Sequence, residues 1–362
     1  MWRSMGLGVS LALCLSCSSK SSHSVEPAPD SGTGGGAAGS GGAAGSGGAA
    51  GTGFGVPQLL IKTDADVKTM ALGGTYALFA GASPGTLGIA ADSTNDSWSD
   101  TGSDLWGVAT DGSTFYAADS TQSRLVYGGV GIPLEPKFVD VAPLVPYVVA
   151  MSPSAVFFGD ESSASPSLWR VATAGGAPSQ IASGIPSPIR LVLDQGWVWL
   201  TTLDEPVLYR IDSKATSVTP QAFLSLATGS GTQAIAVGSS DVFFASYETG
   251  KCPTDTTSTA YRASIATAQA QQLFESPQGI TAMALDGDWL YYSTIGSCPN
   301  FEDATIMRFN VAGGPNAAPE PVATGQARVR DIAVDATAVY WLSAGGFDVG
   351  GPPAGIIKLP KG

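Results

Sequence analysis

The chain has one histidine in 362 residues, and that residue, His23, lies near the amino terminus. A Ser-His-Asp or Cys-His catalytic group therefore cannot form in the remaining chain, and neither can a zinc or iron site with histidine ligands. Chemistry based on carboxylates alone stays open, either with paired acids or with an oxygen-ligated Ca²⁺. No glycine-rich loop follows a strand and opens a helix, as a phosphate-binding loop requires. The sequence alone therefore does not identify a reaction.

Long hydrophobic runs are also scarce. The apolar stretch at the amino terminus extends only from Leu7 to Leu15, whereas a membrane-spanning helix needs about 18 apolar residues or more. One cation, Arg3, precedes this stretch and small residues follow it before Cys17. This arrangement predicts a secretory signal peptide over residues 1–16.

The segment Leu15-Ser16-Cys17 resembles a bacterial lipobox. The resemblance implies cleavage before Cys17 and lipidation of its thiol and new amino group, and Ser18 favours export to the outer membrane. Cys14 stands where the pattern usually has Leu, and Leu15 is bulky for its position, so a plain cleaved signal is the alternative. With several acyl chains the anchor would be firm. We therefore expect an extracytoplasmic, lipid-anchored protein without any other membrane contact.

Residues 17–55 are rich in Ser, Pro, Gly and Ala and include GGGAAGSGGAAGSGGAAG. This composition cannot bury enough apolar surface to fold. We expect a flexible tether with a typical reach on the order of 35 Å.

Positive charge is scarce, with 17 Lys and Arg against 30 Asp and Glu and a net charge of −13. The charges of the amino-terminal segment cancel, so the whole excess belongs to residues 56–362. Binding to nucleic acid requires a basic surface, which argues against a nucleic-acid partner.

Residues 56–362 contain an internal repeat. Each copy has an apolar triplet, an Asp, Gly or Ser anchor, three further residues, and an apolar or aromatic run such as Val339-Tyr340-Trp341. Short β-branched and aromatic runs separated by turn residues are typical of antiparallel strands. Successive anchors lie 38, 41, 42, 44, 48 and 49 residues apart, which is about one propeller blade. The anchors are Gly73, Asp111, Ser152, Asp194, Gly238, Asp286 and Asp335.

The last repeat ends at Lys361 without the fourth strand that several earlier repeats have. The surplus apolar segment from Gln58 to Lys62 would supply that strand, which closes a ring and leaves no long edge exposed. We therefore predict an all-β fold, a seven-bladed β-propeller over residues 56–362, closed by an amino-terminal strand.

Ile332-Ala333-Val334-Asp335 with Val339-Tyr340-Trp341 resembles the repeats of YWTD and NHL propellers and of propeller-bearing bacterial lipoproteins. Leu342-Ser343 stands where the YWTD pattern has Thr-Asp, so the ligand-binding habits of that family do not carry over. Propellers host hydrolases, lyases, lectin-like binders and scaffolds. Propeller lyases that use a channel histidine are excluded here, because His23 is outside the repeats.

Two cysteines, Cys252 and Cys298, fall in equivalent loops of adjacent repeats. Outside the cytoplasm we expect them to form a disulfide. Closing about 46 residues would stabilise the fold by roughly 4 kcal/mol on the loop-entropy model. A metal site with two thiolates is the alternative, but it lacks further ligands.

The third strand of five repeats carries a basic residue. These residues could form a ring that grips an anionic ligand, or their stems could pack between blades while their heads pair with nearby carboxylates, which we favour. They are Arg170, Arg210, Arg262, Arg308 and Lys358.

The loops between the second and third strands are acidic and lengthen in repeats five to seven. In a propeller they open on one face, where variable loops on a rigid scaffold usually hold the binding site. Solvated turn carboxylates are the alternative reading. The candidate face comprises Asp160, Glu161, Asp204, Glu205, Tyr247, Glu248, Phe301, Glu302, Asp303 and Asp348.

Two functions fit this sequence. The first is a non-enzymatic, monomeric binding or scaffold module that presents this face to a protein of the cell envelope, without a cofactor. The second is a carboxylate- or Ca²⁺-dependent enzyme that acts on a glycan or a lactone, as some other propellers do.

Overall fold

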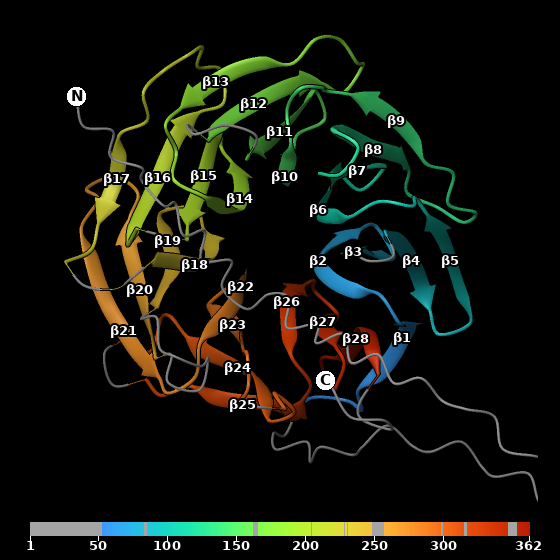
Figure 1. The fold of residues 1–362 in the computed structure, drawn as a ribbon. Coiled ribbons are helices and arrows are strands. Elements are labelled where there is room, and N and C mark those ends of the chain that lie inside the picture. Colours follow the sequence, from blue (N-terminus) through green and yellow to red (C-terminus); the bar gives the residue numbers. More distant parts are fainter. Residues whose placement is uncertain are drawn as a thin grey trace, which may run out of the picture. The chain divides into compact units, whose positions relative to one another are not determined.

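The computed structural model describes residues 53–82, 85–161, 166–203, 205–227, 229, 231–247, 257–297, 300–314, 317–346 and 353–362. These residues form seven four-stranded antiparallel sheets arranged as the blades of a closed ring, as predicted (Figure 1). No helix occurs within the described ranges.

Each blade begins with a strand that lines the centre of the ring (Figure 1). The innermost strands are β2 (Asp66–Gly73), β6 (Leu105–Thr110), β10 (Pro146–Met151), β14 (Pro188–Asp194), β18 (Gly231–Val237), β22 (Ile280–Asp286) and β26 (Val329–Val334). The second strands are β3 (Tyr76–Ala82), β7 (Thr114–Asp119), β11 (Ala155–Asp160), β15 (Trp197–Thr202), β19 (Asp241–Tyr247), β23 (Trp289–Thr294) and β27 (Ala338–Ala344).

The third and fourth strands lie progressively farther from the centre. The third strands are β4 (Thr86–Asp92), β8 (Arg124–Gly129), β12 (Ser167–Ala172), β16 (Val207–Asp212), β20 (Ser258–Ser264), β24 (Ala304–Asn310) and β28 (Ala354–Pro360). The outermost strands are β5 (Asn95–Asp100), β9 (Lys137–Asp140), β13 (Ser179–Ser183), β17 (Ala222–Ser225), β21 (Ala270–Ser276), β25 (Glu320–Gln326) and β1 (Gln58–Thr63).

The ring closes where the sequence predicted. β1 pairs antiparallel with β28, so the last blade has the order β1-β28-β27-β26. The pairing continues beyond β1 toward the amino terminus. The Gly55 amide donates to the Pro360 carbonyl at 2.8 Å, and Phe54 forms a bridge with Lys361. These contacts involve residues from Gly53 on, the first that the structure describes.

The anchors of the repeat are turn residues that join the first and second strands. Asp111 Oδ1 accepts hydrogen bonds from the amides of Ser113 and Thr114 at 2.9 and 2.8 Å. At the equivalent position Ser152 Oγ accepts the amide of Ala155 at 3.1 Å. A short side-chain acceptor at this position holds the tight turn, which explains why Asp and Ser recur there.

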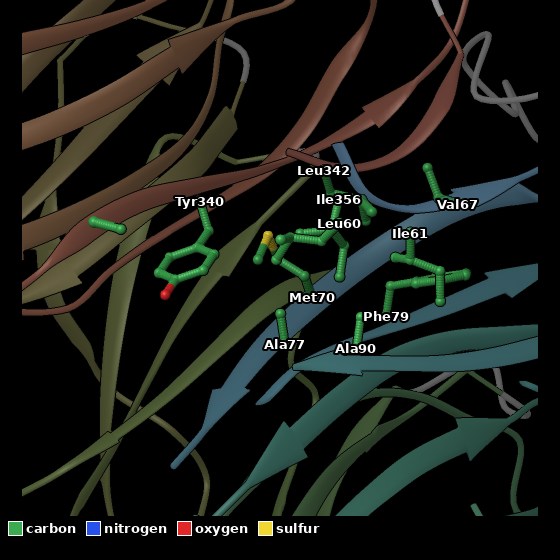
Figure 2. Close-up of a cluster of buried hydrophobic side chains, with 11 residues drawn as sticks. Leu60, Ile61, Val67, Met70, Ala77, Phe79, Ala90, Tyr340, Leu342 and Ile356 are labelled. Carbon is green, nitrogen blue, oxygen red and sulfur yellow. The ribbon is translucent and has the colours of Figure 1, made fainter. Parts of the chain in front are cut away.

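The hydrophobic core is divided into wedges between neighbouring blades. Each cluster of buried side chains draws on two adjacent sheets. Figure 2 shows the wedge at the closure, where Tyr340 and Ile356 of the last blade meet Met70 and Phe79 of the first. Because the first and last blades share a core, the two ends of the repeat region are held by packing as well as by strand pairing.

Candidate binding face and channel mouth

All innermost strands start at the same end of the ring. The strands of a blade alternate in direction, so this end also carries the connections between second and third strands. We call it the loop face. The opposite end carries the short turns that follow the anchors. The predicted lengthening is present, since the last three of these connections span residues 248–257, 295–303 and 345–353, against 83–85 and 120–123 in the first two.

Every innermost strand is irregular at an equivalent point near the loop face. The register with the second strand shifts there in all blades, for example between Val67 and Thr69 in β2 and between Val329 and Asp331 in β26. Bulges of this kind redirect side chains and are common beside functional sites. The residues at the shift, each five positions before its anchor, are Lys68, Trp106, Tyr147, Ile189, Gln233, Thr281 and Arg330.

The irregular positions of three neighbouring blades hold a cation and two aromatic rings in contact. Lys68 Nζ lies 2.6 Å from Asp66 Oδ2 and 4.2 Å from the centre of the Trp106 ring. The rings of Trp106 and Tyr147 have centroids 4.8 Å apart. Burial lowers the pKa of Lys68, against the hydrogen bond to Asp66, and the positive charge of Arg330 adds to this lowering.

Arg330 belongs to the same position in the last blade, and β26 neighbours β2 in the ring (Figure 1). The residue is only 8 % exposed. Its Nε is buried and has no hydrogen-bond partner within the part of the chain that the structure describes. Burial, reinforced by the positive charges of Arg328 and Arg190, lowers its pKa to about 10. We use the term channel mouth for Lys68, Trp106, Tyr147 and Arg330.

An ion pair crosses the channel directly after this layer. Arg190 Nη1 of β14 lies 3.2 Å from Asp331 Oδ2 of β26, and Arg190 Nη2 donates to the Arg330 carbonyl at 2.8 Å. Asp331 Oδ2 also accepts the amide of Met70 at 3.0 Å. Three inner strands are therefore tied together across the centre, and the pair forms a floor under the channel mouth.

A cavity of about 190 Å³ lies at the level of this pair. Apart from Arg190, Asp331 and Thr69, the residues that line it are apolar residues, Met70 and Met283 among them.

Two of the acidic residues at the second-to-third connections are buried. Asp119 has no exposed side chain and pairs with Arg124 Nε at 2.7 Å. Asp160 is 2 % exposed, and its Oδ1 accepts the amide of Val145 at 2.8 Å. Asp119 holds its own connection, Asp160 holds the connection that precedes β10, and neither adds to the exposed surface.

Other predicted residues do reach the loop face. Glu161 is exposed, and reduced hydration together with the neighbouring carboxylate of Asp160 raises its pKa. Glu205 is half-buried, and its Oε2 accepts the Tyr209 hydroxyl at 3.1 Å. Asp303 is exposed, and hydrogen bonds from Ser297 outweigh the opposing effect of burial and lower its pKa.

The two aromatic residues of the predicted candidate face, Tyr247 and Phe301, are buried or half-buried. Tyr247 is 6 % exposed, and its hydroxyl donates to the Leu203 carbonyl of the neighbouring blade at 2.6 Å. Phe301 is half-buried with a φ of 56°, and its carbonyl accepts the Arg328 amide at 2.7 Å. Both residues brace connections between blades. Glu302 is half-buried, and its Oε1 has no hydrogen-bond partner in the described ranges.

Several predictions concern positions outside the described residues. The lipidation site, the disulfide and part of the acidic face stay predictions for this reason. These positions are Cys17, Asp204, Glu248, Cys252, Cys298 and Asp348.

The basic residues of the third strands contact their own and neighbouring blades. Arg170 Nη1 donates to the Ser213 carbonyl of the next blade at 2.8 Å. Arg210 lies 4.5 Å from the Trp197 ring, and Arg262 pairs with Asp241 at 2.7 Å. Because the third strands are removed from the channel, these residues pack and pair within the fold.

Sequence reasoning missed the channel mouth. The signal was present, because Lys68 and Arg330 occupy the same position of the repeat, as do Trp106 and Tyr147. The apolar pattern of the inner strands, however, does not predict the bulge at which these side chains lie.

Within the described ranges, no group of three or more His, Cys, Asp or Glu side chains is placed to hold a metal ion. No helix long and apolar enough to cross a membrane is found among those residues.

Comparison with known proteins gave structural matches only: no family model matches, and no curated protein matches. Virginiamycin B lyase from Staphylococcus aureus superposes with a TM-score of 0.64 at 12% identity, over 84% of this chain and 98% of the lyase. YCF48 bound to D1 peptide gives 0.59 at 8% identity, over 84% and 95%. Oligogalacturonate lyase in complex with manganese gives 0.57 at 17% identity, over 80% and 86%. These similarities define the chain as a β-propeller, a fold shared here by enzymes and binding proteins.

Proposed function

We propose that the protein is a non-enzymatic binding module, anchored outside the cytoplasm through a lipidated Cys17, whose loop face engages a protein partner of the cell envelope. The observation that carries this proposal is the concentration of unusual features at one end of a rigid ring. The irregular starts of the inner strands, the channel mouth and the longest connection, at residues 248–257, all lie on the loop face. Variable loops on a rigid scaffold are a usual place for binding.

The composition of the face supports binding over catalysis. The lyases that superpose on this chain include a catalytically inactive histidine-to-alanine variant of virginiamycin B lyase, and the present chain has no histidine beyond His23. Near the mouth, Asp66 is paired with Lys68 and Asp331 with Arg190. A carboxylate that is held in an ion pair with a cation is poorly suited to general acid or base catalysis. The carboxylate- or Ca²⁺-dependent enzyme acting on a glycan or lactone is the alternative proposal.

The partner is tested by affinity capture from envelope extract with the full chain, tagged at its carboxyl terminus. One bait is unchanged and a second carries Glu161→Gln, Glu205→Gln and Asp303→Asn. A matched control carries Asp92→Asn, Asp212→Asn and Asp288→Asn, which removes the same charge from exposed positions at the opposite end of the ring.

A protein retained by the unchanged bait and by the control, and lost by the loop-face variant, is the expected result. Retention by all three baits, or by none, contradicts the proposal. Membrane fractionation of a Cys17→Ala variant tests the anchor, since the protein should leave the membrane fraction; an unchanged distribution would rule lipidation out as its cause.

A further inference from the structure

The most unusual side chain of the described structure is Arg330. It is buried to 8 % exposure, and its Nε has no hydrogen-bond partner among the described residues. Burying a charged group is costly unless a counter-charge and hydrogen bonds compensate. At least one donor of this guanidinium is therefore open to an acceptor from outside the described structure.

Other buried or half-buried cations near the loop face have partners. Lys68 is paired with Asp66, Arg190 with Asp331, and Arg124 with Asp119. In each pair the two charges lie within 3.2 Å. Arg328 and Arg190 lower the pKa of Arg330 through their positive charges, while Asp66 and Tyr147 oppose them. Asp66 is already paired with Lys68, and among the described residues Arg330 has no ion pair of its own, so it can attract an incoming negative group.

The neighbours of Arg330 limit what this group can be. A guanidinium offers planar, paired donors that match the two oxygens of a carboxylate or phosphate. Lys68 adds a second cation, and Trp106 with Tyr147 adds a flat apolar flank. Exposed acids such as Glu161 and Asp303 lie on the same loop face, and the whole chain carries a net charge of −13. A polyanion would be repelled, whereas a ligand with a single oxyanion group would not.

We propose that the channel mouth binds one oxyanion group, a carboxylate or a phosphate, of a small ligand, with Arg330 and Lys68 as its charge partners and Trp106 and Tyr147 beside its body. This inference rests on the loop face being the binding face and names the chemistry recognised at its centre. The floor formed by Arg190 and Asp331 limits entry, because that pair is already fixed by β2, β14 and β26.

The test is calorimetric titration of the full chain, at low ionic strength, with two separate probes: inorganic phosphate and benzoate. Binding of phosphate alone assigns the site to phosphate groups, and binding of benzoate alone assigns it to carboxylates with a flat body. Arg330→Gln and Lys68→Gln should each lower the affinity for the bound probe about tenfold or more, as expected for loss of a charged hydrogen-bond partner. Arg330→Lys should retain part of the affinity.

Arg262→Gln is the matched control, because it removes one positive charge from a third strand, where Arg262 pairs with Asp241. The Arg262→Gln variant should bind the probe with the same affinity as the unchanged protein. If the Arg330→Gln variant does not fold, the affinity of the Lys68→Gln variant for the probe tests the proposal. The proposal is overturned if neither probe binds, if binding survives both mouth substitutions, or if the control weakens it equally. Since the probes need no protein partner, this result is separate from that of the capture experiment.

Discussion

Arg330 combines deep burial with an Nε that has no hydrogen-bond partner among the described residues, so a stability measurement can separate a ligand-binding role from a structural one. A buried cation that completes an ion pair costs about 3–5 kcal/mol when removed, whereas an uncompensated buried charge itself destabilises the folded state. We predict that Arg330→Met raises the free energy of unfolding, measured by urea denaturation, because it removes the burial of this charge.

The comparison for Arg330→Met is Arg262→Met. Arg262 is paired with Asp241 and its side chain is 39% exposed, so its loss should change stability by less than about 1 kcal/mol. A clear loss of stability in Arg330→Met, larger than that of Arg262→Met, would mean that Arg330 supports the fold.

Asp111 illustrates how a single turn residue ties stability to pH. Although burial acts to raise its pKa, hydrogen bonds from Thr114 and Ser113 lower it from 3.8 to about 2. A carboxyl group with a lowered pKa in the folded state stabilises above its unfolded pKa, and this contribution is lost as pH falls through the folded pKa. Asp111→Ala should therefore cost about 1 kcal/mol at pH 7 and progressively less between pH 4 and pH 2.

Ser152→Ala is the control for this titration, because Ser152 occupies the equivalent anchor without a charge. Its effect should not vary over the same pH range. A cost of Asp111→Ala that is equal at pH 7 and pH 2 would show that the charge of Asp111 is not what holds the turn.

The closing pair of strands depends on one glycine. Gly355 of β28 has a φ of +147°, and a Cβ there would lie 1.9 Å from the Ile61 carbonyl oxygen of β1. β1 and β28 cannot move apart to make room for this Cβ without breaking the closure of the ring. Gly355→Ala should lower the free energy of unfolding by about 2 kcal/mol or more, measured by thermal or urea denaturation.

Gly129→Ala provides the matched change, since no atom lies within 4 Å of a Cβ at Gly129 and its φ is not positive. This variant should be nearly neutral. Equal stability of the two variants would mean that β1 does not pair with β28 as described.

The connections between β19 and β20 and between β23 and β24 carry the two cysteines of the propeller, and these connections belong to adjacent blades. We predict a disulfide between Cys252 and Cys298. Peptide mapping without reductant should find the linked peptides. Reduction or Cys252→Ser should cost up to roughly 4 kcal/mol in unfolding free energy. Free thiols in the exported protein would contradict this prediction.

At the level of elements, the sequence was most informative where period and turn chemistry coincide. The anchors predicted the turns, and the surplus segment Gln58–Lys62 predicted β1. The roles of side chains at the connections were less readable, because an acidic residue after a strand can face solvent, as Glu161 does, or accept a backbone amide, as Asp160 does. That choice depends on which amide of the neighbouring connection comes within reach.

The whole molecule is a ring whose core lies between blades. Each wedge joins two neighbouring sheets, so the blade count follows from the number of repeats together with the closing strand. Both were visible in the sequence. The channel mouth was not, because its residues come from separate repeats and meet only when the ring is closed. Lys68 and Arg330 are adjacent in space for this reason alone, as the first and last blades touch.

The central claim is that the loop face holds a ligand site centred on Arg330. It is tested most directly by a crystal structure of the full chain, grown without oxyanions and then soaked with inorganic phosphate or benzoate. We predict a probe bound to the Arg330 guanidinium and close to Lys68 Nζ, at the mouth of a seven-bladed ring. An Arg330 side chain paired with a carboxylate of the protein itself, and a mouth without bound probe, would contradict it.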